Sequence, residues 1–289
     1  MNLAVSHRDA QTLAKTLRAF GDLSDLKIFT NEQATRDNLE EAVTRWLPSV
    51  SRPGDTVFIF FSGHGGQLPD DNGDEKDQLD EFIVPHDFVS AGILGVLLEK
   101  YKQRQLTAAQ SARVERLASL YRQAGDNAPD ALVRATAVTD DLFGRWIQRL
   151  SGRQVIVILD TCYSGGFATN EKSLSGRNQN TFDFIDGEMA RLKDIGEKDQ
   201  AMLSAAFAAE VAYERTEADT SVLTHFLVAG LRELSGPVQL EQLHQYCEGK
   251  MAAYFEQWRR DAESEGEEAP APAHPHLVNY CIRPVYLKP

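Results

Sequence analysis

The sequence predicts an α/β protein with a mostly parallel central sheet, and two apolar runs separated by helical patterns support this prediction. Residues 56–61 read T-V-F-I-F-F, and residues 155–159 read V-I-V-I-L. Both runs are short, β-branched or aromatic, and apolar throughout, as central strands buried on both faces are. Helical patterns alternate with strand patterns along most of the chain, which is typical of a parallel sheet covered by helices.

Weaker patterns complete this scheme. Further strands are expected at residues 26–29, 81–84 and 201–206. Helices are expected at residues 9–20, 35–47, 139–150, 221–234 and 239–258. Thr35 is a suitable N-cap for the second of these helices, and Pro48 is expected to end it.

Two long segments interrupt the alternation. Residues 91–138 are much longer than a usual connection, and their centre at 107–123 is rich in Ala, Leu, Arg and Gln, so we expect a helical insertion packed on the edge of the sheet. Residues 164–200 are poor in apolar side chains and contain five basic residues, which predicts a mobile linker open to proteolysis, including self-cleavage. We therefore expect one domain whose two parts, 1–163 and 201–289, flank this linker.

The composition narrows the classes of function. The 289 residues carry a formal net charge of −13 without any run of Lys or Arg, so a nucleic-acid partner is not expected. Three cysteines without metal-type spacing fit a reducing compartment. We see no secretory signal and no apolar run long enough to cross a bilayer, so we expect a cytoplasmic protein without a membrane partner.

A histidine and a cysteine follow the two strong strands. His64 lies in S-G-H-G-G after the first strand, and Cys162 lies in D-T-C-Y-S-G-G after the second. Ligands of open α/β sheets bind outside the carboxyl ends of the strands. A thiol becomes a nucleophile beside a base such as histidine, so the two residues together predict a catalytic pair. Either residue alone would more often be structural.

The motifs around these residues resemble those of caspase-like cysteine peptidases. F-F-S-G-H-G-G-Q at 60–67 is similar to the histidine motif of that family, and L-D-T-C-Y-S-G-G at 159–166 is similar to the cysteine motif of its metacaspase branch. M-L-S-A-A-F-A-A-E at 202–210 resembles the beginning of the small-subunit part. The resemblance covers nearly the whole chain outside 91–138, and it implies a caspase-like three-layer α/β/α sandwich.

The resemblance also implies the roles of individual residues. Cys162 would attack the scissile carbonyl, and His64 would protonate the leaving amine. The backbone N–H groups of Gly65 and Cys162 would form the oxyanion hole. The chain would then be a cysteine endopeptidase.

A pocket for a basic residue is implied by three further matches. Asp160 matches the metacaspase acid in the pocket for the residue before the cut, Ser62 matches the pocket serine, and Asp9 matches a second acid. Buried carboxylates favour Arg or Lys and repel Asp. We therefore expect protein substrates that are cut after Arg or Lys.

Calcium is the one cofactor that the resemblance suggests, as an activator. The residues that match the family's site are Asp80, Asp140 and Asp141, and carboxylate oxygens suit this ion. A solvated acidic loop without metal explains the same residues equally well. An EF-hand at 70–81 is excluded because Glu75 stands where such a loop needs glycine.

The chain departs from the family at its start. Caspase-like folds begin with a strand in the middle of the sheet, but Met1 already matches the loop after that strand. The chain is then a fragment, or an upstream segment or a partner chain supplies the strand, or the sheet closes differently. An uncovered strand edge would invite pairing with another chain. Two other functions stay open, a non-enzymatic scaffold and a calcium-responsive binding module.

Overall fold

The computed structural model describes residues 3–21, 23, 25–73, 78–162, 199–206, 212–215 and 219–288, with only the backbone of Cys162. Within this part, six strands form one sheet in the order β3-β2-β1-β4-β5-β7. Their bounds are β1 Thr56–Pro69, β2 Leu79–Ile83, β3 Val138–Thr139, β4 Gln154–Cys162, β5 Asp199–Ser204 and β7 His276–Asn279. Two short strands, β6 (Val238–Gln239) and β8 (Tyr286–Lys288), form a separate small sheet.

The centre of the large sheet is parallel. β4 runs parallel to β1 on one side and to β5 on the other, whereas β2, β3 and β7 are antiparallel to their neighbours. The expected strong strands are therefore β1 and β4, side by side. Residues 155–159 of β4 are at most 2% exposed, which confirms a strand buried on both faces.

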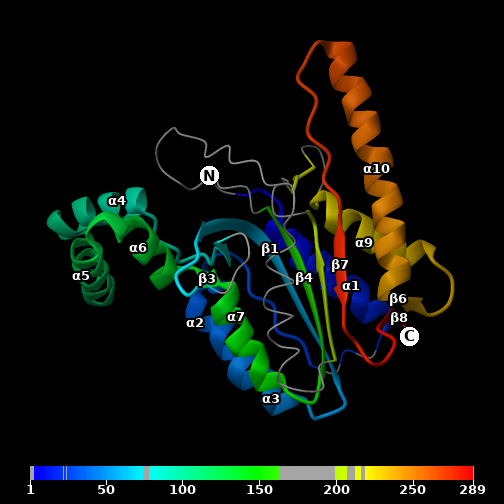
Figure 1. Ribbon diagram of the computed structural model, residues 1–289, viewed down its shortest axis with the longest axis horizontal. Helices are drawn as coiled ribbons and strands as arrows, with labels where there is room; N and C mark the ends of the chain where they lie inside the picture. Colours follow the sequence, from blue (N-terminus) through cyan, green and yellow to red (C-terminus); the bar gives the residue numbers. More distant parts are fainter. Residues whose placement is uncertain are drawn as a thin grey trace.

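Helices cover both faces and complete three layers (Figure 1). One face carries α1 (Ser6–Phe20), α9 (Val222–Glu233) and α10 (Leu240–Glu265), which pack against Ile156 and Ile158. The other face carries α2 (Arg36–Glu41), α3 (Leu47–Val50) and α7 (Asp140–Ile147), and its core includes Val155, Val157 and Leu159. Successive residues of β4 thus pack alternately into the two cores, because the side chains of a strand point to opposite faces of the sheet.

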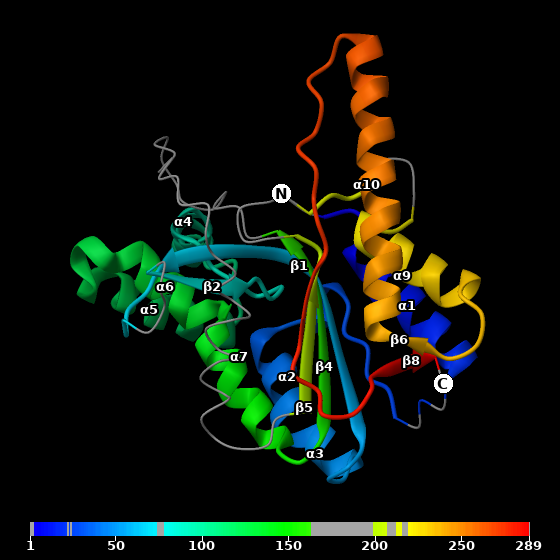
Figure 2. The same cartoon turned by 45° about the vertical axis from the view of Figure 1, so that its right-hand side comes forward.

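The insertion forms a helical unit of its own. It contains α4 (Ala91–Lys102), α5 (Ala108–Gln123), the 3₁₀ turn η3 (Gly125–Asn127) and α6 (Ala128–Thr136). Leu94, Leu117 and Leu132 belong to its separate small core. Figure 2 shows these helices to one side of the sandwich, on the side of β2 and away from α9 and α10. This placement agrees with the expected position at the edge of the sheet.

Several expected boundaries are wrong. No strand forms at 26–29, because no backbone ladder joins this extended segment to β1 in the described structure. The helix that begins after Thr35 does not end at Pro48. A wider π-helical turn, η2 (Ala42–Trp46), precedes the proline, and the helix continues as α3 to Val50. A π-helical turn offers one way to continue a helix through proline, which has no backbone N–H to donate.

Other boundaries differ by a few residues. β5 begins at Asp199, so the last two residues assigned to the linker belong to the sheet; residues 164–198 lie outside the described part. α10 extends to Glu265, beyond the expected end at Trp258. The remaining short 3₁₀ turns are η1 (Asn31–Gln33) and η4 (Gln148–Leu150). Among the described helices, none combines the length and apolar character needed to cross a membrane.

Candidate active site

Residues His64 and Cys162 are register partners on the two central strands. The pairing of β1 with β4 runs from Thr56 opposite Gln154 to His64 opposite Cys162. The strands are parallel, so both residues lie at the carboxyl edge of the sheet, where α/β proteins bind ligands. The structure thus brings the backbones of the predicted pair together. The side chain of Cys162 lies outside the described part.

The predicted pocket residue Asp9 lies in the first turn of α1 and is fully buried. The hydroxyl of Ser62, on β1, donates a hydrogen bond to its Oδ2 atom at 2.7 Å. The backbone N–H of Ser221 donates to its Oδ1 atom at 2.8 Å. These contacts join the start of α1 to β1 and to the start of α9.

The second predicted pocket acid, Asp160, lies on β4 and is 5% exposed. Its Oδ2 atom accepts hydrogen bonds from the Thr224 hydroxyl at 2.6 Å and from the Thr224 backbone N–H at 3.1 Å. The Ser221 hydroxyl donates to the same atom. Asp9 and Asp160 therefore share Ser221, which caps α9. We call Asp9, Ser62 and Asp160 the acidic pair site.

Burial raises the pKa of both acids in this site. Desolvation, followed by the nearby charge of Asp160, raises the pKa of Asp9 to about 7. Burial also raises the pKa of Asp160, against the lowering effect of its hydrogen bonds from Ser221 and Thr224. Two buried carboxyl groups that share one site resist joint ionisation unless a cation arrives. The site is therefore suited electrostatically to a positively charged group.

The residues that hold these acids are not evident from the sequence alone. Ser221 and Thr224 were expected only as the first turn of a helix, and their capping pattern was the available signal. Glu214 was also missed. Its carboxylate accepts hydrogen bonds from the backbone N–H groups of Ala4 and Val5, at 3.1 and 2.9 Å, and so holds the chain entering α1.

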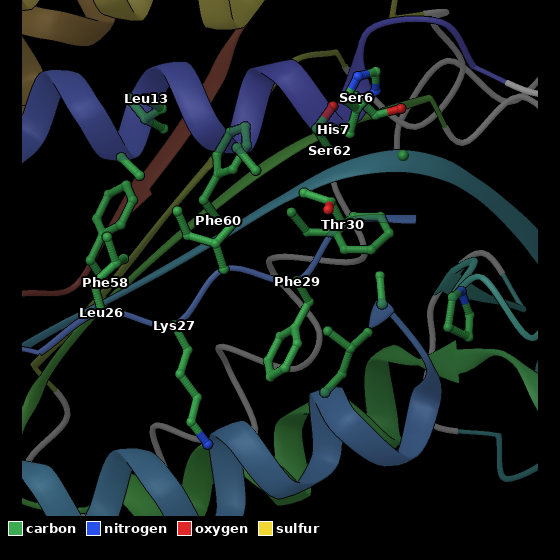
Figure 3. Close-up of a pocket in the computed structure, with 18 of the residues that line it drawn as sticks. Ser6, His7, Leu13, Leu26, Lys27, Phe29, Thr30, Phe58, Phe60 and Ser62 are labelled. Atoms are coloured by element: carbon green, nitrogen blue, oxygen red, sulfur yellow. The ribbon is translucent and has the colours of Figure 1, made fainter. Parts of the chain in front are cut away.

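A cavity of about 920 Å³ extends from this edge along β1. Ser62 and His64 line its end near the site, whereas Asp9 and Asp160 do not line it. Figure 3 shows Phe58 and Phe60 projecting from β1 toward Leu13 of α1, with the extended segment around Phe29 on the opposite side.

The cavity lies against an edge of β1 that no described strand covers. Residues 56–63 pair with β4 on one edge, and no described strand pairs with their other edge. Residues 58–61 are consequently only half-buried, although their sequence is as apolar as that of β4. The structure thus shows an open strand edge where the resemblance predicts that a strand is missing.

The predicted calcium ligands lie in a separate group of acids near the start of β2. Asp80 is 1% exposed, and its carboxylate lies with those of Asp70 and Asp71 so that one oxygen of each is within 4.8 Å of the others. Asp140 is 2% exposed, and its Oδ2 atom has no hydrogen-bond partner among the described residues, which leave out 74–77. Asp141 accepts a hydrogen bond from the Asn72 side chain at 2.9 Å.

These acids influence one another. Burial, and more weakly the charges of Asp80 and Asp141, raise the pKa of Asp140 to about 7. Burial is also the main cause that raises the pKa of Asp80. A buried carboxylate oxygen without a partner, beside other carboxylates, fits a hard cation such as calcium. We call Asp70, Asp71, Asp80, Asp140 and Asp141 the acidic cluster.

Comparisons with known proteins bear on the family and the fold of the chain. A family model described as the caspase domain matches residues 1–278. Metacaspase-1 of Coccidioides immitis is 45% identical over 74 residues, which are 24% of this chain and 16% of that protein. Metacaspase-1B of Aspergillus terreus is 42% identical over 74 residues, or 24% of this chain and 19% of that protein. The matches thus span less than a fifth of these relatives.

Two solved structures resemble the whole chain in fold. A protein from Geobacter sulfurreducens gives a TM-score of 0.55 at 15% identity, covering 96% of this chain and 84% of the other. Caspase-1 from Spodoptera frugiperda gives 0.53 at 11% identity, covering 99% and 83%. These similarities show the three-layer fold expected from the sequence.

Proposed function

Because the chain belongs to the caspase domain family, a family of cysteine peptidases, we propose that it is an endopeptidase that cuts proteins after Arg or Lys. The observation that supports this specificity most strongly is the pair of buried carboxyl groups, Asp9 and Asp160, near the end of the β1–β4 pairing, where His64 lies opposite Cys162. A guanidinium or ammonium group entering there would neutralise them, and guanidinium can be held by two parallel hydrogen bonds.

The proposed reaction uses His64 and Cys162. The Cys162 thiolate attacks the scissile carbonyl carbon, and the developing oxyanion accepts hydrogen bonds from the N–H groups of Gly65 and Cys162. The C–N bond breaks as protonated His64 gives its proton to the leaving amine. Water, deprotonated by His64, then hydrolyses the thioester and regenerates the thiol.

Peptides that differ only in the residue before the cut test this proposal. We expect turnover after Arg and Lys and none after Asp, and we expect Cys162→Ala to abolish it. Asp160→Asn should lower kcat/KM for the Arg peptide at least tenfold, because a charge-assisted contact is lost. Asp219→Asn is the matched control, since Asp219 is a nearby acid whose side chain is 87% exposed. Equal turnover after Asp and Arg would refute the specificity, and absence of turnover in every chain would favour the scaffold function.

Calcium is proposed as an activator of this peptidase, with Asp80, Asp140 and Asp141 as the residues that would hold it. The ion would supply positive charge to these carboxylates. The buried, unpartnered Oδ2 atom of Asp140 supports the proposal. A second proposal is activation by cleavage within residues 164–200. Nearly all of that segment lies outside the described part.

The open edge of β1 supports one proposal about partners. We propose that the cavity accepts an extended apolar segment, from a partner chain or an upstream segment, as a strand parallel to β1. Backbone N–H and C=O groups along the edge of residues 56–63 that no described strand covers would pair with it, and half-buried Phe58 and Phe60 would be covered.

A fluorescently labelled peptide provides the test. We expect the soluble peptide Lys-Lys-Ala-Val-Ile-Val-Gly-Ile to raise its fluorescence anisotropy on binding and to increase the melting temperature of the protein. The same peptide with proline in place of its central isoleucine should not bind, because proline removes a donor and disturbs the strand. Equal binding of both peptides would argue against strand addition.

A further inference from the structure

The inserted helices place a cation in the acidic cluster. Arg134 belongs to the last turn of α6. Its Nη1 atom donates to Asp80 Oδ2, and its Nε atom lies 3.1 Å from Asp71 Oδ2. Its Nη2 atom donates to the backbone carbonyl of Pro69. One guanidinium therefore contacts two carboxylates and one carbonyl, the oxygen types that calcium also takes as ligands.

The position of Arg134 is fixed by other contacts of α6. Leu132 is fully buried in the core of the insertion, and the Thr136 hydroxyl accepts a hydrogen bond from the Val89 N–H at 3.2 Å. Arg36 donates to the carbonyl of Ala135. The helix thus has apolar and polar anchors besides Arg134, so removal of this side chain should leave α6 in place.

The guanidinium neutralises only part of the cluster. Asp140, which is 2% exposed, keeps a carboxylate oxygen without a hydrogen-bond partner in the part of the chain that the structure describes, and its charge interacts with that of Asp80. A divalent ion held by the carboxylates of Asp71 and Asp80, which each have an oxygen within 4.8 Å of the other, would meet the positive charge of Arg134 and would have to displace it from them. Arg134 and the ion therefore compete for the same oxygen atoms.

We propose that Arg134 is an internal counter-cation that competes with calcium for Asp80, so that the inserted helices set the calcium concentration to which the protein responds. This inference rests on the proposed role of calcium and adds its control by residues 91–138. It makes Arg134 a positioning and tuning residue without a part in the chemistry of peptide cleavage.

Calorimetric titration with calcium chloride tests the competition in the full chain carrying Cys162→Ala, which prevents self-cleavage. We expect Arg134→Gln to bind calcium at least tenfold more tightly than the chain with Arg134. Lys102→Gln is the matched control, because Lys102 also belongs to the insertion but its ammonium group pairs with Glu99, outside the acidic cluster, and is 68% exposed. Its affinity for calcium should change less than twofold. Adding Asp140→Asn to Arg134→Gln should abolish the gain.

The outcomes separate this inference from the peptidase proposal. An equal gain in calcium affinity in both glutamine variants would show a general charge effect and would overturn the inference. Unchanged or weaker calcium binding in Arg134→Gln would also overturn it. Absence of calcium binding in every variant would overturn it together with the calcium proposal, while turnover of Arg peptides by the chain with Cys162 would still support the peptidase. If Arg134→Gln does not fold, Arg134→Lys decides, because its single ammonium group should give an intermediate affinity.

Discussion

Replacing Asp9 with asparagine should change how the stability of the protein depends on pH. The folded chain raises the pKa of Asp9 from 3.8 to about 7, mainly by desolvation. Folded molecules therefore retain a proton that unfolded molecules lose above about pH 4. The stabilising effect of this proton is complete below pH 3.8 and disappears as the pH rises toward 7.

The size of the effect follows from the difference between the two pKa values. Each pH unit between them contributes about 1.4 kcal/mol. About two such units lie between pH 5 and the folded pKa, so the native chain should lose on the order of 2.5 kcal/mol between pH 5 and pH 8 through this group. Asparagine has nearly the same shape, can still accept from Ser221, and does not titrate.

Urea unfolding at pH 5 and pH 8 measures this difference, with Cys162→Ala present in both chains. We expect Asp9→Asn to gain about 2.5 kcal/mol relative to its parent between the two pH values. Titrating groups other than Asp160, whose ionisation is linked to that of Asp9, are common to both chains and cancel in the comparison. A relative stability that differs by less than about 0.5 kcal/mol between the two pH values would refute the assigned ionisation of Asp9. With Cys162 present, the same substitution should reduce turnover after Arg.

Two further substitutions test the support of the site. Thr224→Val removes the hydroxyl that donates to Asp160 at 2.6 Å; it should cost about 1–3 kcal/mol in urea unfolding and raise KM for Arg peptides, and full stability would contradict the assigned contact. Gly66 lies on β1, two residues after His64, and Gly66→Ala would place a methyl group 2.6 Å from the ring of Phe82. We expect a loss of about 1–3 kcal/mol in the free energy of unfolding and lower turnover. An unchanged melting temperature would show that the ring moves aside freely.

The sequence predicted the centre of the fold well because its signals there are local. β4 is an unbroken apolar run, and its burial on both faces follows from that composition. His64 and Cys162 follow the two apolar runs closely, and the parallel pairing of β1 and β4 extends to both residues and brings their backbones together. Family resemblance added Asp9, which no local pattern would have joined to Ser62 over 53 positions.

Features that depend on contacts between distant segments were not predicted. Ser221 and Thr224 approach Asp160 only because α9 packs with its first turn against β4. Arg134 is an ordinary helical residue in the sequence, and its contact with Asp80 depends on how the insertion lies against β2. The failed strand at 26–29 has suitable composition, but strand formation also requires a partner edge at hydrogen-bonding distance.

Covalent labelling of Cys162 tests the central claim most directly. A peptide that ends in arginine and carries a thiol-reactive ketone should modify the chain once, and mass spectrometry should locate the adduct on Cys162. The matching peptide that ends in aspartate should label it much more slowly, and Asp160→Asn should remove most of this preference. Labelling of Cys247 or Cys281 instead, or equal rates for the two peptides, would contradict a basic-residue peptidase with Cys162 as its nucleophile.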